Sequence, residues 1–299
     1  MTSPSRPRGG KLRALTGATV LTAGIIAAIP AAAQATPVAC SENALVAAIN
    51  TANTTPAPDT LNLASGCTYG LTSSHGSGAN GPAGLPVITT PIEMIGPATI
   101  TRTTGILRPF RIAEVSTTGN LTLTTAVTLS NGRAASLLGL FGRDGGGILN
   151  RGAVTLTKSS LTNNFAEGTG GGLSNADTPT GTAPAATFTE SPVSSNTAGG
   201  RGGGVYSGRR ATLTMTGAGQ FTPTPVNNNR STGQQGGGIA AINSTATTLT
   251  NIAVTTNRAT GAGGVFRLGG TMTTTTSPIT ANIPNNCVGS VPAVPNCTA

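Results

Sequence analysis

The chain contains no tryptophan, few aromatic residues (3%) and few charged residues (8%). Without large rings it cannot fill a thick core. Low charge combined with 37% hydrophobic residues is the opposite of what disordered chains show. Glycine, the smallest residue, supplies 43 of the 299 positions. We therefore expect a folded protein with a thin, repetitive core of Val, Ile, Leu and Ala.

Histidine and clustered basic residues are also scarce. His75 is the single histidine, so His-based zinc sites and Ser-His-Asp triads lack their usual residues. The formal charge of +9 falls to about +5 once the four basic residues before position 36 are set aside. No run of Lys and Arg is interleaved with aromatics, which argues against nucleic acid as a partner. We expect neither a metal nor a cofactor.

Residues 1–35 are typical of a signal peptide. A basic start precedes the apolar segment Ala14 to Ile29, and Ala33-Gln34-Ala35 forms an A-x-A cleavage site. A membrane anchor is the alternative, but the apolar stretch is short and interrupted by glycine. We expect a secreted, extracellular, monomeric protein that leaves the membrane when the leader is removed.

The four cysteines suit an exported protein. A lipid anchor on Cys40 is one alternative, although Pro37 stands where a lipobox needs an aliphatic residue. Four cysteines allow three disulfide pairings. We expect the local one, which joins Cys40 to Cys67 and Cys287 to Cys297.

A glycine triplet followed by an aliphatic residue recurs at intervals of 25, 32, 34 and 26 residues. The copies begin at Gly145, Gly170, Gly202, Gly236 and, in altered form, Ala262. After each copy come a Thr-apolar-Thr element, such as Thr155-Leu156-Thr157, and an apolar-x-x-Asn element, such as Leu161 to Asn164. Each unit therefore offers three short strand signals and a glycine-rich turn that favours positive φ.

Stacking is what allows such units to bury their apolar residues, because no unit can do so alone. It would align the aliphatic residues after the glycines as one inner column: Ile148, Leu173, Val205, Ile239 and Val265. The Asn residues would lie at corners, tolerate left-handed geometry and form a hydrogen-bonded ladder.

The predicted fold is therefore an all-β, single-stranded parallel β-helix of about nine coils over roughly Thr60 to Ile283. Parallel crossovers are almost always right-handed, so we expect a right-handed coil. We expect one domain over residues 36–299, with an N-terminal cap at 36–60 and a disulfide-closed tail at 284–299. A short helix from Ser41 to Asn50 would cover the first coil.

The glycine and apolar-x-x-Asn elements resemble the repeats of chlamydial polymorphic outer-membrane proteins, although the second element there usually begins with Phe. The chain from about residue 40 to 297 also resembles secreted actinobacterial proteins known as right-handed β-helix repeat proteins. That resemblance rests on Cys40 to Asn53, Leu61 to Cys67, the glycine units and Asn285-Asn286-Cys287. It implies the same fold and indicates little about function.

Many β-helices cleave polysaccharides, and such sites need clustered carboxylates. Only Asp144 and Glu167 stand near the turns before two consecutive glycine triplets, and later coils have Thr169, Arg201 and Gln235 in place of Asp144. These two residues are weak catalytic candidates, and we favour a role as solvated turn residues.

Two features favour binding instead. Tyr206 and Phe266 directly follow inner-column residues and would suit a sugar-stacking face or be scattered surface aromatics. Arg230 and Arg258 each follow the Asn of an apolar-x-x-Asn element, and Arg201 lies near the next turn. Stacked arginines suit a carboxylated or sulfated glycan, although such side chains also splay into water.

The sequence favours a secreted, non-enzymatic protein that interacts with an extracellular surface or matrix, with a polysaccharide or cell-surface glycan as partner. A polysaccharide lyase or glycoside hydrolase of pectate-lyase-like fold is the alternative. A purely structural spacer is the third reading.

Overall fold

The strands of the computed structural model follow the alternation expected from the sequence. In β13 (Ala153–Thr157), Val154 and Leu156 are buried, and the residues between and beside them are partly exposed. This period of two is that of an extended strand with one face on a core. The chain is an all-β parallel solenoid, as expected.

The structure describes residues 1–3, 35–78, 80–103, 105, 108–136, 142–176 and 182–298. The predicted signal peptide, residues 1–35, lies almost entirely outside these residues. The chain divides into two units, Met1–Ala32 and Ala33–Ala299, and the architecture below belongs to the second. No helix among the described residues is long and apolar enough to cross a membrane.

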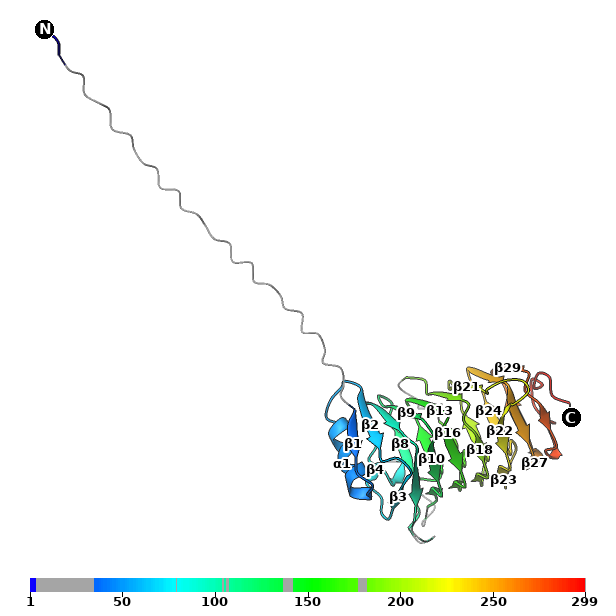
Figure 1. Ribbon diagram of the computed structural model, residues 1–299. Helices are drawn as coiled ribbons and strands as arrows, with labels where there is room; N and C mark the ends of the chain where they lie inside the picture. Colours follow the sequence, from blue (N-terminus) through cyan, green and yellow to red (C-terminus); the bar gives the residue numbers. More distant parts are fainter. Residues whose placement is uncertain are drawn as a thin grey trace. The chain divides into compact units, whose positions relative to one another are not determined.

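The strands stack side by side into four parallel sheets (Figure 1). Sheet 1 contains β1 (Thr36–Val38), β2 (Asp59–Leu63), β6 (Pro91–Ile95), β9 (Asn120–Thr124), β13, β17 (Ala185–Thr189), β21 (Thr212–Thr216), β25 (Ala246–Thr250) and β29 (Thr271–Thr275). Sheet 2 contains β3 (Cys67–Leu71), β7 (Ala98–Arg102), β10 (Val127–Ser130), β14 (Ser160–Thr162), β18 (Val193–Ser194), β22 (Thr224–Asn227), β26 (Ile252–Thr255) and β30 (Ile279–Thr280).

The other two sheets are built from shorter strands. Sheet 3 contains β11 (Arg133–Ala134), β15 (Phe165–Ala166), β19 (Thr197–Ala198), β23 (Arg230–Ser231), β27 (Arg258–Ala262) and β31 (Ile283–Asn285). Sheet 4 contains β8 (Ala113–Val115), β12 (Ile148–Asn150), β16 (Leu173–Asn175), β20 (Val205–Ser207), β24 (Ile239–Ile242) and β28 (Val265–Leu268). An antiparallel hairpin joins β4 (Gly76–Gly78) to β5 (Gly81–Ala83).

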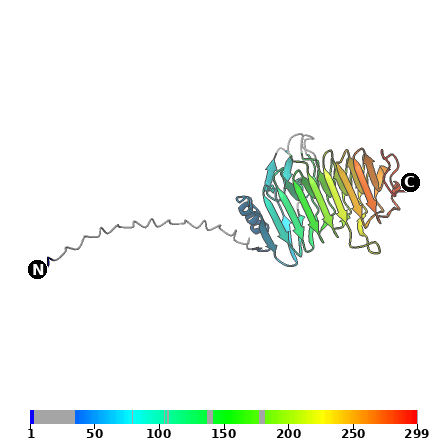
Figure 2. The same ribbon diagram turned by 90° about the horizontal axis from the view of Figure 1, so that it is seen from above.

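The described chain makes about six turns, fewer than the nine we expected. From β8 onward each turn visits sheets 4, 1, 2 and 3 in that order, and this order continues to β31. Figure 2 shows strands of successive turns lying side by side along the solenoid. Before β8, the pairs β2–β3 and β6–β7 visit only sheets 1 and 2. Our count was too high because it treated each upstream strand signal as evidence of a complete coil.

Sheet 3 is the part of each turn that the sequence did not predict. Its strand begins directly after the Asn of the apolar-x-x-Asn element, as Phe165 follows Asn164, and most of its strands have only two residues. Such short strands carry no detectable alternation. The available signal was a small buried residue two positions after that Asn, as at Ala166 and Ala198.

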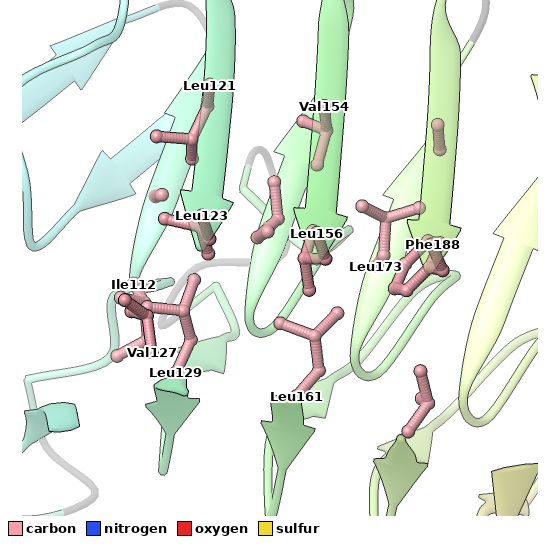
Figure 3. Packing of buried hydrophobic residues seen from close by; sticks show 14 of the residues in the cluster. Ile112, Leu121, Leu123, Val127, Leu129, Val154, Leu156, Leu161, Leu173 and Phe188 are labelled. Carbon is pink, nitrogen blue, oxygen red and sulfur yellow. The ribbon is translucent and has the colours of Figure 1, made fainter. Parts of the chain in front are cut away.

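The predicted inner column is confirmed. Ile148, Leu173, Val205, Ile239 and Val265 are register partners on adjacent strands of sheet 4, and each is 0% exposed. Leu156 and Phe188 on sheet 1 and Leu161 on sheet 2 extend the same core (Figure 3). The predicted positive φ of the glycine triplets is found at Gly145, Gly170, Gly202 and Gly236.

The predicted asparagine ladder also forms. Asn164, Asn196, Asn229, Asn257 and Asn282 are buried, and the side-chain amide of each of the first four donates to Oδ1 of the next at about 3.0 Å. The left-handed geometry lies one residue earlier than expected, at positions such as Asn163, Ser195 and Asn228. The ladder residues are turned inward by that preceding residue.

The N-terminal cap contains α1 (Glu42–Ala52), which matches the predicted helix closely. Ser41 Oγ accepts a hydrogen bond from Ala44 N at 3.2 Å, as an N-cap should. Leu45 and Ile49 are fully buried in the common core, and Val46 is half-buried. The cap is linked to β3 by the disulfide Cys40–Cys67.

The loop that contains His75 is fastened to this cap. His75 Nε2 lies 2.8 Å from Glu42 Oε1. The Glu42 carboxylate also accepts hydrogen bonds from Thr72 N, Thr72 Oγ1 and Ser73 N. Partial burial on its own would raise the pKa of Glu42, but these bonds outweigh that effect and lower it.

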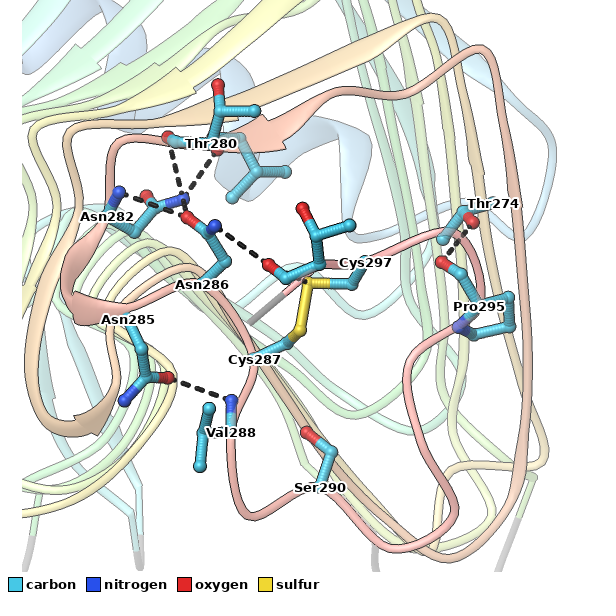
Figure 4. Close-up of a disulfide and its surroundings, with 12 residues drawn as sticks. Thr274, Thr280, Asn282, Asn285, Asn286, Cys287, Val288, Ser290, Pro295 and Cys297 are labelled. Carbon is cyan, nitrogen blue, oxygen red and sulfur yellow. Dashed lines mark hydrogen bonds between the residues drawn. A yellow bond between two sulfur atoms is a disulfide. The ribbon is translucent and has the colours of Figure 1, made fainter.

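The C-terminal tail is closed by the second predicted disulfide, Cys287–Cys297 (Figure 4). Asn286 continues the ladder beyond Asn282, and its amide donates to Thr298 O at 2.9 Å. Thr274 Oγ1, at the end of sheet 1, donates to Pro295 O at 2.6 Å. The tail therefore folds back over the last turn.

Candidate functional site

The outward positions of sheet 3 form one straight column. Each residue of the column is the register partner of the next on an adjacent strand. On the first four of these strands, the residue that follows the column residue is small and buried, so the column itself faces outward. We call these residues the sheet 3 column: Arg133, Phe165, Thr197, Arg230, Arg258 and Ile283.

Arg230 and Arg258 are the centre of the candidate site. They are direct register partners in β23 and β27, as the sequence predicted, and both are exposed. Within the described part of the chain, neither guanidinium has a hydrogen-bond or ion-pair partner. Neighbouring strands lie about 4.8 Å apart, so two like charges are held close together without compensation.

The other end of the column pairs an arginine with an aromatic ring. Arg133 Cζ lies 4.3 Å from the centroid of the half-buried Phe165 ring, a cation–π contact. Arg133 Nε is buried and has no hydrogen-bond partner among the described residues. Sequence reasoning missed both residues, although Phe165 occupies the same position after a ladder asparagine as Arg230 does.

A further arginine adds to the positive charge beside Arg133. Arg102, at the end of β7, donates from Nε to Asn131 O at 3.0 Å and stacks over Phe110. Burial and, to a smaller extent, the charge of Arg133 lower the pKa of Arg102. The early turns therefore also bring cations together on this side of the solenoid.

Arg201 lies outside the column, in the turn before sheet 4. Its Nε donates to Gln235 Oε1 at 3.3 Å, and its Cζ lies 5.8 Å from the Phe266 ring centroid. Arg201 and Phe266, which the sequence offered as separate binding candidates, are thus in contact. Arg201 is partly buried, and its place in the ligand site with Arg230 and Arg258 stays an untested prediction.

Tyr206 and Phe266, for which we weighed a sugar-stacking face against scattered surface aromatics, are both largely covered. Leu149, Ser174, Tyr206, Ala240 and Phe266 do stack in register on sheet 4. Phe266 is only 6% exposed, however, and Tyr206 is half-buried. The glycine-rich turns cover this surface, and Thr169 Oγ1 lies 3.1 Å from Ser174 Oγ. A sugar ring has no open aromatic pair to stack on here.

Asp144 and Glu167 each form hydrogen bonds that hold a turn in place. Asp144 Oδ1 accepts hydrogen bonds from Thr169 N at 2.6 Å and Thr169 Oγ1 at 2.9 Å. Glu167 Oε2 accepts from Ser136 N at 3.1 Å and lies 3.4 Å from Arg143 Nε. These contacts fit the turn role that we favoured, and a catalytic role stays an untested prediction.

Sequence analysis missed a buried ion pair at the start of sheet 4. Arg111 Nη1 lies 3.0 Å from Glu114 Oε2, with side chains 0% and 5% exposed. Arg111 also donates to Gly81 O at 3.1 Å and Asn80 O at 2.6 Å, which pins the β4–β5 hairpin. Burial lowers the pKa of Arg111, and the charge of Glu114 offsets part of that effect.

A small pocket lies beside this ion pair. Its volume is about 170 Å³, and it is lined by Asn80, Arg111, Gly142, Arg143, Asp144, Leu149 and Arg151. Sites for drug-sized ligands are roughly 300–1,000 Å³, so this pocket is too small for a sugar chain. Within the described ranges, no group of three His, Cys, Asp or Glu side chains is placed to hold a metal ion.

The sheet 3 column is therefore the surface best arranged for binding. It is interpreted from its own geometry, because no family model, curated protein or solved structure matches the chain.

Proposed function

We propose that the chain is a secreted, extracellular protein that binds an acidic polysaccharide or cell-surface glycan along the sheet 3 column and does not cleave it. The observation that carries this proposal is that Arg230 and Arg258 are exposed register partners, and that neither guanidinium has an ion-pair partner within the described residues. A carboxylated or sulfated chain would neutralise their mutual repulsion. Guanidinium groups bind such anions in a bidentate manner.

The spacing of the column suits a linear polymer. Arg133 and Arg258 are four turns apart, which is about 19 Å along the solenoid. A polysaccharide lying along the column would meet Arg133 at one end and Arg230 with Arg258 at the other. The partly exposed Phe165 and Thr197 between them offer an apolar ring and a hydroxyl to the sugars.

An extracellular location is supported by three features. The two disulfides, Cys40–Cys67 and Cys287–Cys297, are typical of proteins that fold in an oxidising compartment. The leader expected over residues 1–35 and the resemblance to secreted actinobacterial β-helix repeat proteins point the same way.

A glycan array that includes pectate, alginate and heparan sulfate tests the proposal. We expect binding that weakens steeply with salt, because screening acts on exposed charges. Replacing both arginines, Arg230→Ala with Arg258→Ala, should weaken affinity roughly tenfold or more, since each charge-assisted hydrogen bond contributes about 1.5–3 kcal/mol. The melting temperature should not change.

A matched control removes two charges from another face. Arg209→Ala with Arg210→Asn is suitable, because Arg210 has a φ of +64° that Asn tolerates. Equal binding by the wild type and the Arg230 and Arg258 double variant would exclude the column. Product analysis of each bound glycan tests the alternative: cleavage that Asp144→Asn abolishes would make the protein a polysaccharide lyase or hydrolase.

A further inference from the structure

Sheet 1 carries a second ordered surface, on a different side of each turn from the arginines. Its strands β9, β13, β17, β21, β25 and β29 each present two outward threonines, at the third and fifth strand positions. Every threonine is the register partner of a threonine on the next strand, without any shift. We call these residues the threonine array: Thr122, Thr155, Thr187, Thr214, Thr248, Thr273, Thr124, Thr157, Thr189, Thr216, Thr250 and Thr275.

The hydroxyl groups of the array are left to solvent. Thr124 Oγ1 donates to Glu93 Oε1 at 3.2 Å, and in the described structure the other eleven hydroxyls have no hydrogen-bond partner. Sheet 2 behaves differently, because Thr128 and Ser160 bond to each other there at 2.9 Å. The hydroxyls of sheet 1 are therefore available for water or a ligand.

The array is also uncharged, and the residues beside it are small. The six strands contain no Asp, Glu, Lys or Arg. The third outward column beside the threonines consists of small or short residues: Asn120, Ala153, Ala185, Thr212, Ala246 and Thr271. β-Branched side chains are restricted at χ1, so each threonine of the array has few rotamers available. The array ends where β6 introduces Glu93 and Ile95.

The repeat distances of such an array are set by the backbone. Threonines on adjacent strands lie about 4.8 Å apart, and threonines two residues apart on one strand lie about 6.7 Å apart. The surface is thus a rectangular grid in which each point offers one hydroxyl and one methyl group. Water bound to this grid would repeat in two directions, with spacings close to those between water molecules on a face of crystalline ice.

We propose that the threonine array binds the surface of ice. A dissolved glycan repeats in one direction and does not use a two-dimensional grid, and an ionic ligand would find no charge on these strands. An ice face meets the whole array at once, so that many weak contacts act together. This site is independent of the sheet 3 column, which faces another direction and binds through charge.

The purified full-length protein should slow the recrystallisation of ice at micromolar concentration and shape growing crystals into facets. Thr214→Lys puts a long charged side chain in the middle of the array and should abolish both effects. Thr255→Lys is the matched control, because Thr255 is equally half-buried on sheet 2 and its hydroxyl has no partner among the described residues. Circular dichroism and the melting temperature should show that both variants fold.

Two results would overturn the proposal. One is a wild-type protein that affects ice no more than serum albumin does, and the other is Thr214→Lys acting as strongly as the wild type. A dimer that Thr214→Lys dissociates, without any effect on ice, would show that a second copy occupies the face instead. The Arg230 and Arg258 double variant should keep full activity on ice, which separates this site from glycan binding.

Discussion

Asn196, inside the ladder, satisfies four hydrogen-bonding groups where water does not reach. The side-chain amide of Asn196 donates to Leu161 O and to Asn229 Oδ1, both at 3.0 Å. Its Oδ1 accepts from Asn164 N and Asn164 Nδ2, also at 3.0 Å. One side chain therefore connects three successive turns.

Asn196→Ala should be strongly destabilising. It leaves several buried polar groups without partners, each at about 1–3 kcal/mol, so we expect a loss of roughly 3–5 kcal/mol in the free energy of unfolding. Urea denaturation followed by circular dichroism measures it. Asn228→Gly is the control, because Asn228 is exposed and has a φ of +55° that glycine accepts. An unchanged urea midpoint in Asn196→Ala would mean that the ladder is dispensable.

The inner column gives a second prediction at the scale of one residue. Ile239 is 0% exposed, so Ile239→Asp buries an unpaired charge that costs several kcal/mol, and we expect no folded protein. Asp144→Asn should fold normally, because the Asn oxygen can still accept both hydrogen bonds from Thr169. Expression and the near-ultraviolet circular dichroism of the two variants distinguish these outcomes; a soluble, cooperatively unfolding Ile239→Asp protein would contradict the placement of the column.

At the scale of elements, the contact between α1 and the loop after β3 depends on one carboxylate. Hydrogen bonds lower the pKa of Glu42 in the folded protein below its unfolded value of 4.5. A lowered pKa contributes stability above the unfolded value, and that stability is lost as the pH falls through the folded pKa. The contact should therefore loosen in acid and hold at neutral pH.

Amide hydrogen exchange at Thr72 and Ser73 tests this pH dependence. Protection should be constant above about pH 5 and fall below the unfolded pKa of 4.5. Glu42→Gln should remove the transition and lower the protection at neutral pH. Glu190→Gln, which removes a carboxylate from an exposed ion pair with Lys158, should leave the transition in place. A transition that persists in Glu42→Gln would assign it to another group.

The elements also show how much the sequence could reveal. The positive φ of Gly145 and its equivalents, the inner column and the capping role of Ser41 all follow from local chemistry and from a repeat of fixed period. The strands of sheet 3 could not be predicted in this way, because a strand of two residues is too short for alternation to be visible. The number of turns was overestimated because the segment before β8 has strand signals without the glycine triplet that marks a complete turn.

The candidate site, too, could be predicted only in part. The stacking of Arg230 on Arg258 was predictable, because each follows the asparagine of a recognisable motif. The burial of Phe266 was not predictable, because it depends on contacts from other coils, among them the contact of Arg201 with its ring. The Arg111–Glu114 pair was hidden as well, since nothing in the local sequence shows that a hairpin thirty residues earlier covers both charges.

At the scale of the whole molecule, each turn packs mainly against its two neighbours, so the ends are the weak points. Both ends carry a disulfide, with sequence separations of 27 and 10 residues. Each should contribute about 2–4 kcal/mol by restricting the unfolded chain. In Cys287→Ser with Cys297→Ser, amide exchange should quicken in β29, β30 and β31 while the central turns stay protected. Equal protection at β29 with and without the bond would refute a role against fraying.

The unbroken register from β9 to β29 has a consequence for how such a molecule can change over generations. Residues 205–238 make one complete circuit of the four sheets, and Val205 and Ile239 occupy equivalent positions at its start and after its end. A tandem copy of this segment would add one strand to every sheet, two threonines to the array and about 4.8 Å to the solenoid, with both caps intact. Length is therefore a trait that duplication of a short stretch of coding sequence can adjust in equal steps, without any redesign of the interior.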